Sequence, residues 1–196
     1  MRKIITIGRE FGAGGGEIGR CVAKELGIPY YDRDIILRTA AASSKLRPEQ
    51  VMKWDERVPG SFGFAQSLFD FYNKPLDEEL WKAQKDAIRE MANKESCVIV
   101  GRNGDHILRH FDHCLNVFVH AGFNWRVKRM CGLMADATKE QVIADVKQAD
   151  KARKKYCEYY TGKTYGDSRS FDLTINTEKL GVEKAIRLVL AAAENI

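Results

Sequence analysis

The start of the chain combines an apolar segment, a glycine-rich turn and an amphipathic helix, and this combination limits the fold more than any other feature of the sequence. Residues 3–8 are rich in isoleucine, and five glycines fall within residues 12–19. A stretch with apolar residues at helical spacing follows and ends at Gly27. Successive glycines at the start of a helix let backbone N–H groups converge on an anion. The sequence therefore predicts a phosphate-binding loop here, with a ligand-free glycine turn as the alternative.

Short apolar segments along the rest of the chain alternate with helical stretches. The expected strands span residues 3–8, 28–32, 97–101, 115–120 and 172–176, and the expected helices span 17–26, 76–92 and 182–193. Several strands are rich in Val and Ile, as interior strands of a parallel sheet are. This order predicts an α/β fold in which a five-stranded parallel sheet is flanked by helices, with right-handed crossovers.

Two connections are much longer than a simple crossover helix. About 65 residues separate the second expected strand from the third, and about 50 separate the fourth from the fifth. We interpret residues 1–196 as one domain with two inserts, at residues 33–94 and 130–171. The first insert is rich in aromatic residues that either pack on their own domain or form a homodimer contact; they include Phe62, Phe64, Phe69 and Phe71.

Composition excludes several classes of protein. Hydrophobic residues make up 44% of the chain and charged residues 30%, which is typical of a globular protein rather than a disordered one. The net charge of +5 favours small phosphorylated ligands; RNA binding through the basic and aromatic residues 154–165 is a weaker alternative. No apolar run approaches the ~20 residues of a membrane span, the N-terminus lacks a signal-peptide core, and the five cysteines form no CxxC pair. We expect a cytoplasmic protein with no membrane contact.

The glycine-rich loop fits two kinds of nucleotide site. Residues 14–19 match GxGxxG, and Asp32 ends the second expected strand, as in a dinucleotide-binding fold. However, residues 9–12 separate the first strand from the matching glycines, whereas the first glycine of that motif directly follows its strand. The spacing of a phosphoryl-transfer loop, GxxxxGK[ST], fits better.

The phosphoryl-transfer interpretation leaves one expected cation missing. If residues 12–14 are set on the GAG of the GAGKGT form of this loop, Gly15 occupies the lysine position and Glu17 the threonine position. The lysine normally stays with the phosphate in transfer, so an active enzyme needs another cation. The candidates are Arg9, Arg20 and Arg102.

Six segments together resemble the cytidylate kinase-like family of the nucleoside monophosphate kinase group. They are ITIGREFGAGGGEIGR, GIPYYDRDIILR, CVIVGRNGDHIL, FNWRVKRM, DKARKKYCEYYTGKTYGD and FDLTINTEKLG, in this order. The resemblance implies a P-loop NTPase fold with an acceptor-binding insert and a lid. It also implies transfer of the γ-phosphoryl group of ATP, bound with Mg²⁺, to CMP, dCMP or a related small acceptor. A catalytically impaired, nucleotide-binding regulatory protein is the alternative, because the loop lacks its lysine.

The resemblance also implies roles for individual residues. The ATP phosphates would bind the loop residues Gly12, Ala13, Gly14, Gly15, Gly16 and Glu17, and the acceptor would bind Asp32, Arg38, Arg102 and Asp150. Arg126 and Arg153 would supply cations from the lid, near the basic run of Lys147, Lys151, Lys154 and Lys155. We add Arg9, which directly precedes the loop, as the permanent cation in place of the lysine.

Some of these residues also have an ordinary structural explanation. Asp32 can cap the next helix and Arg38 can form a surface ion pair. Asn103 follows Arg102 where the family has Asp, which weakens the transfer of acceptor contacts to this position. His106, His110 and His113 lack the HExxH pattern, so we predict no metal site built from protein ligands.

Overall fold

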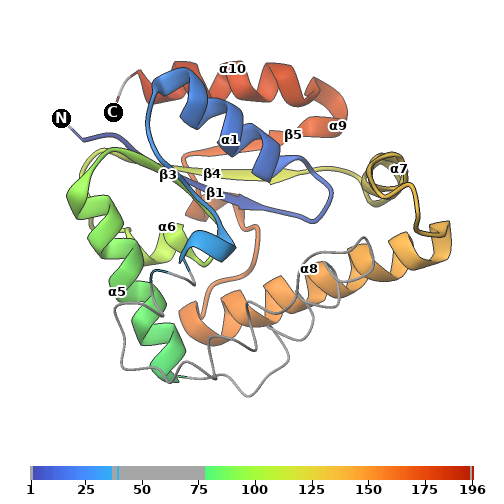
Figure 1. Cartoon of the computed structure of the whole chain (residues 1–196), viewed down its shortest axis with the longest axis horizontal. Helices are drawn as coiled ribbons and strands as arrows, with labels where there is room; N and C mark the ends of the chain where they lie inside the picture. Colours follow the sequence, from blue (N-terminus) through green and yellow to red (C-terminus); the bar gives the residue numbers. More distant parts are fainter. Residues whose placement is uncertain (1, 37–38, 40–77, 195) are drawn as a thin grey trace.

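Five parallel strands form a single sheet in the order β2-β3-β1-β4-β5 (Figure 1). The structure is a computed structural model, and it describes residues 2–36, 39, 78–194 and 196. The strands are β1 (Ile4–Arg9), β2 (Tyr30–Tyr31), β3 (Cys97–Val100), β4 (Cys114–His120) and β5 (Leu173–Asn176). The sheet and all five expected strands are confirmed, with strand ends that differ by at most two residues.

Helices cover both faces of the sheet (Figure 1). In the described part of the chain they are α1 (Gly15–Leu26), α5 (Glu78–Lys94), α6 (Gly104–Ile107), α7 (Phe123–Leu133), α8 (Lys139–Thr161), α9 (Thr177–Leu180) and α10 (Val182–Ala193), with a 3-10 turn at Ser168–Ser170. Figure 1 shows α1 and α10 on one face and α5, α6 and α8 on the other. The chain therefore has three layers, as the alternation of strands and helices predicts.

The central strand β1 contributes to both hydrophobic layers. Its side chains alternate between the faces, so Ile5 and Ile7 pack with α1 and α10 while Ile4 packs toward α5 and α8. All three isoleucines are at least 98% buried. The strand lies between β3 and β4, and its carboxyl end leads directly into the glycine-rich loop. The loop therefore begins from the central strand of the sheet.

The two predicted inserts hold α5 and α8. Helix α8 begins with a capping box between Thr138 and Gln141, in which each side chain bonds the other residue's backbone N–H, and it ends at Gly162. In Figure 1 this long helix runs from the α7 side of the molecule back to the lower end of α5. Arg38 and the four phenylalanines of the first insert lie outside the described residues, and the domain boundaries stay a prediction. None of the described helices is long and apolar enough to cross a membrane.

A close approach between α1 and the sheet gives a test of this packing. A Cβ atom on Gly19 would lie 2.8 Å from Cγ2 of Val100, so Gly19→Ala must displace a core side chain. We expect a loss of about 1–3 kcal/mol in the free energy of unfolding, measured with urea. The control is Gly132→Ala in α7, where no atom lies within 4 Å of the new Cβ. It should leave stability unchanged or raise it by up to about 1 kcal/mol, and an equal loss in both variants would contradict this packing.

Candidate functional site

The loop between β1 and α1 presents the start of a helix with no side-chain cap. Gly12 and Gly14 have φ angles of 81° and 91°, values that a residue with a Cβ adopts only at a cost. Gly14 is the N-cap of α1 and makes no side-chain capping hydrogen bond. The first N–H groups of a helix have no partner within the helix. The start of α1 is therefore suited to bind an anion.

Side chains from distant parts of the chain hold the carbonyl groups of this loop. Arg153 Nη1, at 2.9 Å, and Tyr165 Oη both donate to Arg9 O. Arg126 Nη1 donates to Phe11 O at 2.8 Å, and Arg129 Nη1 donates to Gly12 O at 3.4 Å. Thr177 Oγ1 donates to Ala13 O at 2.8 Å. In a trans peptide the N–H points opposite to the C=O. With the carbonyls of Phe11 and Ala13 bonded to these donors, the N–H groups of Gly12 and Gly14 point to the other side of the loop.

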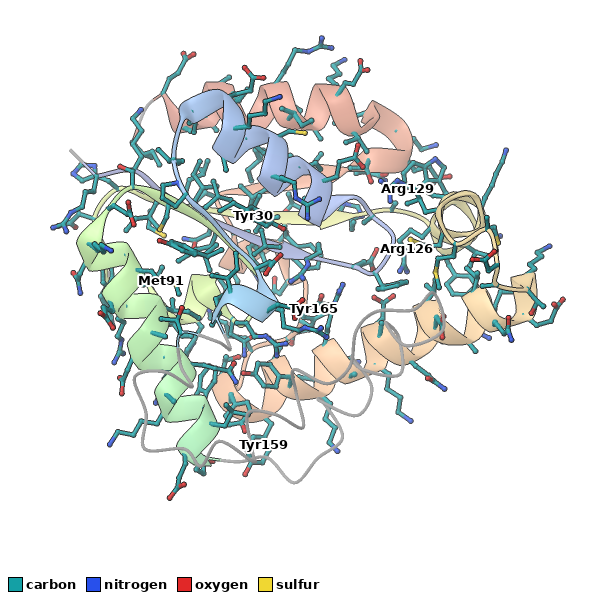
Figure 2. The ribbon with its side chains drawn as sticks, in the orientation of Figure 1. Tyr30, Met91, Arg126, Arg129, Tyr159 and Tyr165 are labelled. Atoms are coloured by element: carbon teal, nitrogen blue, oxygen red, sulfur yellow. The ribbon has the colours of Figure 1, made fainter. Side chains whose placement is uncertain are left out.

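Arg126 and Asp150 clamp one peptide group of the loop. Asp150 Oδ1 accepts the N–H of Phe11 at 2.8 Å, and Arg126 Nη1 donates to Asp150 Oδ2 at 2.6 Å as well as to Phe11 O. Nε of Arg126 also donates to Ala121 O and lies 3.3 Å from Glu10. Figure 2 shows Arg126 between α7 and the loop. The structure thus gives both residues contacts that fix the loop.

A second arginine of α7 lies at the same loop. Arg129 Nη2 forms an ion pair with Glu17 in the first turn of α1, at 2.5 Å. The guanidinium also lies within 4 Å of the Cβ position of Gly14, next to the N-cap. The negative charge of the Glu17 carboxylate is therefore paired with the positive charge of Arg129.

Arg102 lies in an unusual turn that follows β3. Gly101, Arg102 and Asn103 have consecutive φ angles of 82°, 57° and 53°. The left-handed conformation costs roughly 1–2 kcal/mol for a residue with a side chain, and such strain gathers at functional sites. The Arg102 side chain is 4% exposed, and its guanidinium carbon lies 5.7 Å from the ring centroid of Tyr156 on α8.

A cleft opens at the carboxyl ends of β1 and β3, where ligands of α/β sheets bind. It lies between the strand ends, α8 and the segment after α8, and it is partly open to solvent. Its basic side chains are Arg9, Arg102, Arg153 and Lys163, of which Lys163 pairs with Asp105 at 3.2 Å. The cleft therefore has a net positive charge suited to phosphates.

Two titratable groups near the cleft are held neutral. Burial raises the pKa of the Cys157 thiol, which lines the cleft, so the thiol stays protonated at neutral pH. Burial, and next the neighbouring Arg109, lower the pKa of His106. Cys157 therefore adds no negative charge to the cleft, and His106 adds no positive charge beside it.

Arg9 fills the space next to Gly15. A Cβ on Gly15 would lie 2.6 Å from Cβ of Arg9, and a Cβ on Gly101 would collide with Nη1 of Arg9. The side chain thus extends from the glycine loop to the turn after β3. Its cation lies between the candidate ATP site and Arg102.

Other sequence candidates have different contacts. Asp32 Oδ1 accepts the N–H groups of Asp34 and Ile35 at 3.1 and 3.2 Å, so it caps the following turn, as the structural alternative predicted. Arg20 lies over the ring of Tyr30 at 5.3 Å. Arg38 is outside the described residues, so its acceptor role stays a prediction.

Comparisons with known proteins show the family and the fold of this chain. The family model described as "Cytidylate kinase-like family" matches residues 4–179. The chain belongs to the cytidylate kinase-like family. It is 24% identical to the cytidylate kinase of Thermococcus kodakarensis, over 98% of this chain and 89% of that protein. It is 27% identical to the cytidylate kinase of Staphylothermus marinus, over 95% of this chain and 93% of that protein.

Solved structures show the same fold. An uncharacterized protein from Eubacterium ventriosum superposes with a TM-score of 0.76 at 25% identity and covers all of both chains. A gluconokinase from Sinorhizobium meliloti gives a TM-score of 0.56 at 15% identity, over 100% of this chain and 97% of that one. The chain therefore has the fold of the P-loop kinases. Family and fold together support a nucleotide kinase.

Two side chains that bond the loop match no motif in the sequence. Thr177 is 99% buried and bonds the loop carbonyl of Ala13, and Tyr165 bonds that of Arg9. Both contact backbone atoms that lie more than 150 residues away along the chain. The signal in the sequence was their position inside two of the segments that carry the family resemblance.

The loop clamp predicts a stability effect that is independent of nucleotide. Arg126→Ala leaves Asp150 without its cation and Phe11 O without its donor, and removing one partner of a largely buried pair costs about 3–5 kcal/mol. Urea unfolding in the absence of nucleotide should show this loss. Lys154→Ala removes an exposed pair with Glu158 and should cost less than about 1 kcal/mol. Equal effects of both substitutions would mean that the clamp contributes nothing.

Proposed function

We propose that this protein is a nucleoside monophosphate kinase that transfers the γ-phosphoryl group of ATP to CMP, dCMP or a related small acceptor. The observation that carries the proposal is the position of Arg9, which packs against Gly15 at the uncapped start of α1 and lines the cleft that contains the buried cations Arg102 and Arg153. Phosphoryl transfer depends on positioning and on charge stabilisation rather than on a general base. The family supports nucleotides as substrates, and the choice of CMP rests on the relatives' names.

The reaction assigns a task to each part of the site. An oxygen of the acceptor phosphate attacks the γ-phosphorus, a new P–O bond forms, and the bond to the β,γ-bridging oxygen breaks so that ADP leaves. The amides at the start of α1 bind the phosphates of ATP. Arg102 binds the acceptor phosphate, and Arg153 adds charge on the α8 side of the cleft. Arg9, which extends between them, stabilises the charge on the transferring group.

Mg²⁺ is proposed to arrive with ATP. The described residues contain no group of three or more His, Cys, Asp or Glu side chains that could hold a metal ion by themselves. Mg²⁺ typically keeps several waters and binds through substrate phosphates with one or two carboxylates. The metal would neutralise charge on the β- and γ-phosphates, while the protein would supply the amides and arginines around them.

The direct test is a screen of nucleoside monophosphates with ATP and Mg²⁺, in which ADP release is measured. Arg102→Ala should weaken binding of the accepted monophosphate by about 1.5–3 kcal/mol, the value of a hydrogen bond to a charged group. Binding of ATP, measured by calorimetry, should change far less. Equal losses for both nucleotides would show that Arg102 does not define the acceptor site. ATP binding with no transfer to any monophosphate would favour the regulatory alternative.

A second test concerns the cation that replaces the lysine. Arg9→Ala should lower kcat by ~10²- to 10³-fold, the usual effect of losing one group that stabilises the transition state. Gly15→Lys alone forces its Cβ against Arg9, at 2.6 Å. The double variant Arg9→Gly with Gly15→Lys removes that clash, because glycine has no Cβ atom, and it should recover part of the activity that Arg9→Ala loses. If the double variant is as slow as Arg9→Ala, the charge of Arg9 is not what the site requires.

A further inference from the structure

Glu17 presents an electrostatic problem for the proposed nucleotide site, on which this inference rests. Its carboxylate lies in the first turn of α1, the turn whose N–H groups would bind phosphate. An acidic side chain is favourable at a helix N-terminus when no ligand is present, but it repels an anion that binds to the same turn. The side chain is about half exposed, so water alone does not screen it fully.

Arg129 is placed to remove this repulsion. Its guanidinium pairs with Glu17 at 2.5 Å and donates to Gly12 O at 3.4 Å, so it joins the two ends of the loop. Arg129 comes from α7, 112 residues further along the chain, and its side chain is 20% exposed. In Figure 2, Arg129 lies beside Arg126 and extends from α7 to the start of α1. The pair has no net charge, whereas Glu17 alone would leave one negative charge at the anion site.

We propose that Arg129 is a positioning residue for nucleotide binding, which acts by neutralising Glu17 and not by binding phosphate itself. Glu17 and Arg129 then form one unit. The start of α1 accepts phosphate only when the carboxylate is paired or absent. A phosphate-binding arginine would behave differently, because its loss could not be compensated at Glu17.

The test measures the dissociation constant of ADP with Mg²⁺ by calorimetry in four variants and the wild type. Arg129→Ala should weaken ADP about tenfold or more, because it leaves Glu17 unpaired beside the phosphates. Glu17→Gln should bind ADP as tightly as the wild type or more tightly. The double variant Glu17→Gln with Arg129→Ala should return to within about threefold of the wild type. The defect of Arg129→Ala should also shrink as salt is raised, since partly exposed charges are screened.

Lys128→Ala is the matched control. Lys128 is an exposed neighbour on the same helix, and its loss changes the net charge of the protein equally. Its ADP binding should stay within about twofold of the wild type.

Each other outcome overturns the inference. A double variant as weak as Arg129→Ala would show that Arg129 binds phosphate or only stabilises the loop, because Glu17→Gln cannot restore the bond to Gly12 O. A tenfold loss in Glu17→Gln would show that the carboxylate helps binding, and this variant remains informative if Arg129→Ala does not fold. A loss in Lys128→Ala equal to that in Arg129→Ala would point to net charge alone. Failure of the wild type to bind ADP would instead refute the proposed nucleotide site.

Discussion

The site depends on the hydrogen bonds that hold the carbonyl groups of the loop between β1 and α1. Each carbonyl of residues 9 and 11–13 accepts a side-chain donor from α7, α8, the segment after α8 or the start of α9. Because these carbonyls are bonded on one side, the N–H groups of Gly12 and Gly14 point to the other side of the loop. A loop without a lysine can thus be ordered before any nucleotide binds, and preorganised donors are the ones that lower a reaction barrier.

The contacts that hold the loop also determine where the charged side chains around it lie. Arg126 and Arg129 use their cations to hold the loop and to neutralise Asp150 and Glu17. Arg9, Arg102 and Arg153 line the cleft, and the last two are more than 90% buried. Arg126 and Arg129 therefore act behind the loop and Arg9 and Arg102 at the cleft, while Arg153 does both because it also donates to Arg9 O. This division explains how a chain with a net charge of only +5 can concentrate positive charge at one place.

The sequence predicted the fold because its signals are local. Apolar strands, the glycine run and helical spacing all act within a few residues, and the sheet and the uncapped start of α1 agree with them. Arg102 lies in the cleft, at a strand end that the sequence identified. The contacts of Asp150 and Arg126 with Phe11 join segments more than 110 residues apart, so no spacing rule could reveal them. The sequence allowed two roles for Asp32, acceptor binding and helix capping, and the structure contains the hydrogen bonds of the cap.

The most direct measurement is the amide NMR spectrum of the glycine loop during titration with ADP and Mg²⁺. If the N–H groups at the start of α1 bind the phosphates, the signals of Gly12, Gly14, Gly15 and Gly16 should shift downfield and saturate together, because a hydrogen bond to a charged oxygen deshields the amide proton. Adenosine, which has no phosphate, should leave these four signals in place. Saturable ADP binding that moves signals elsewhere in the protein but not these four would contradict the account.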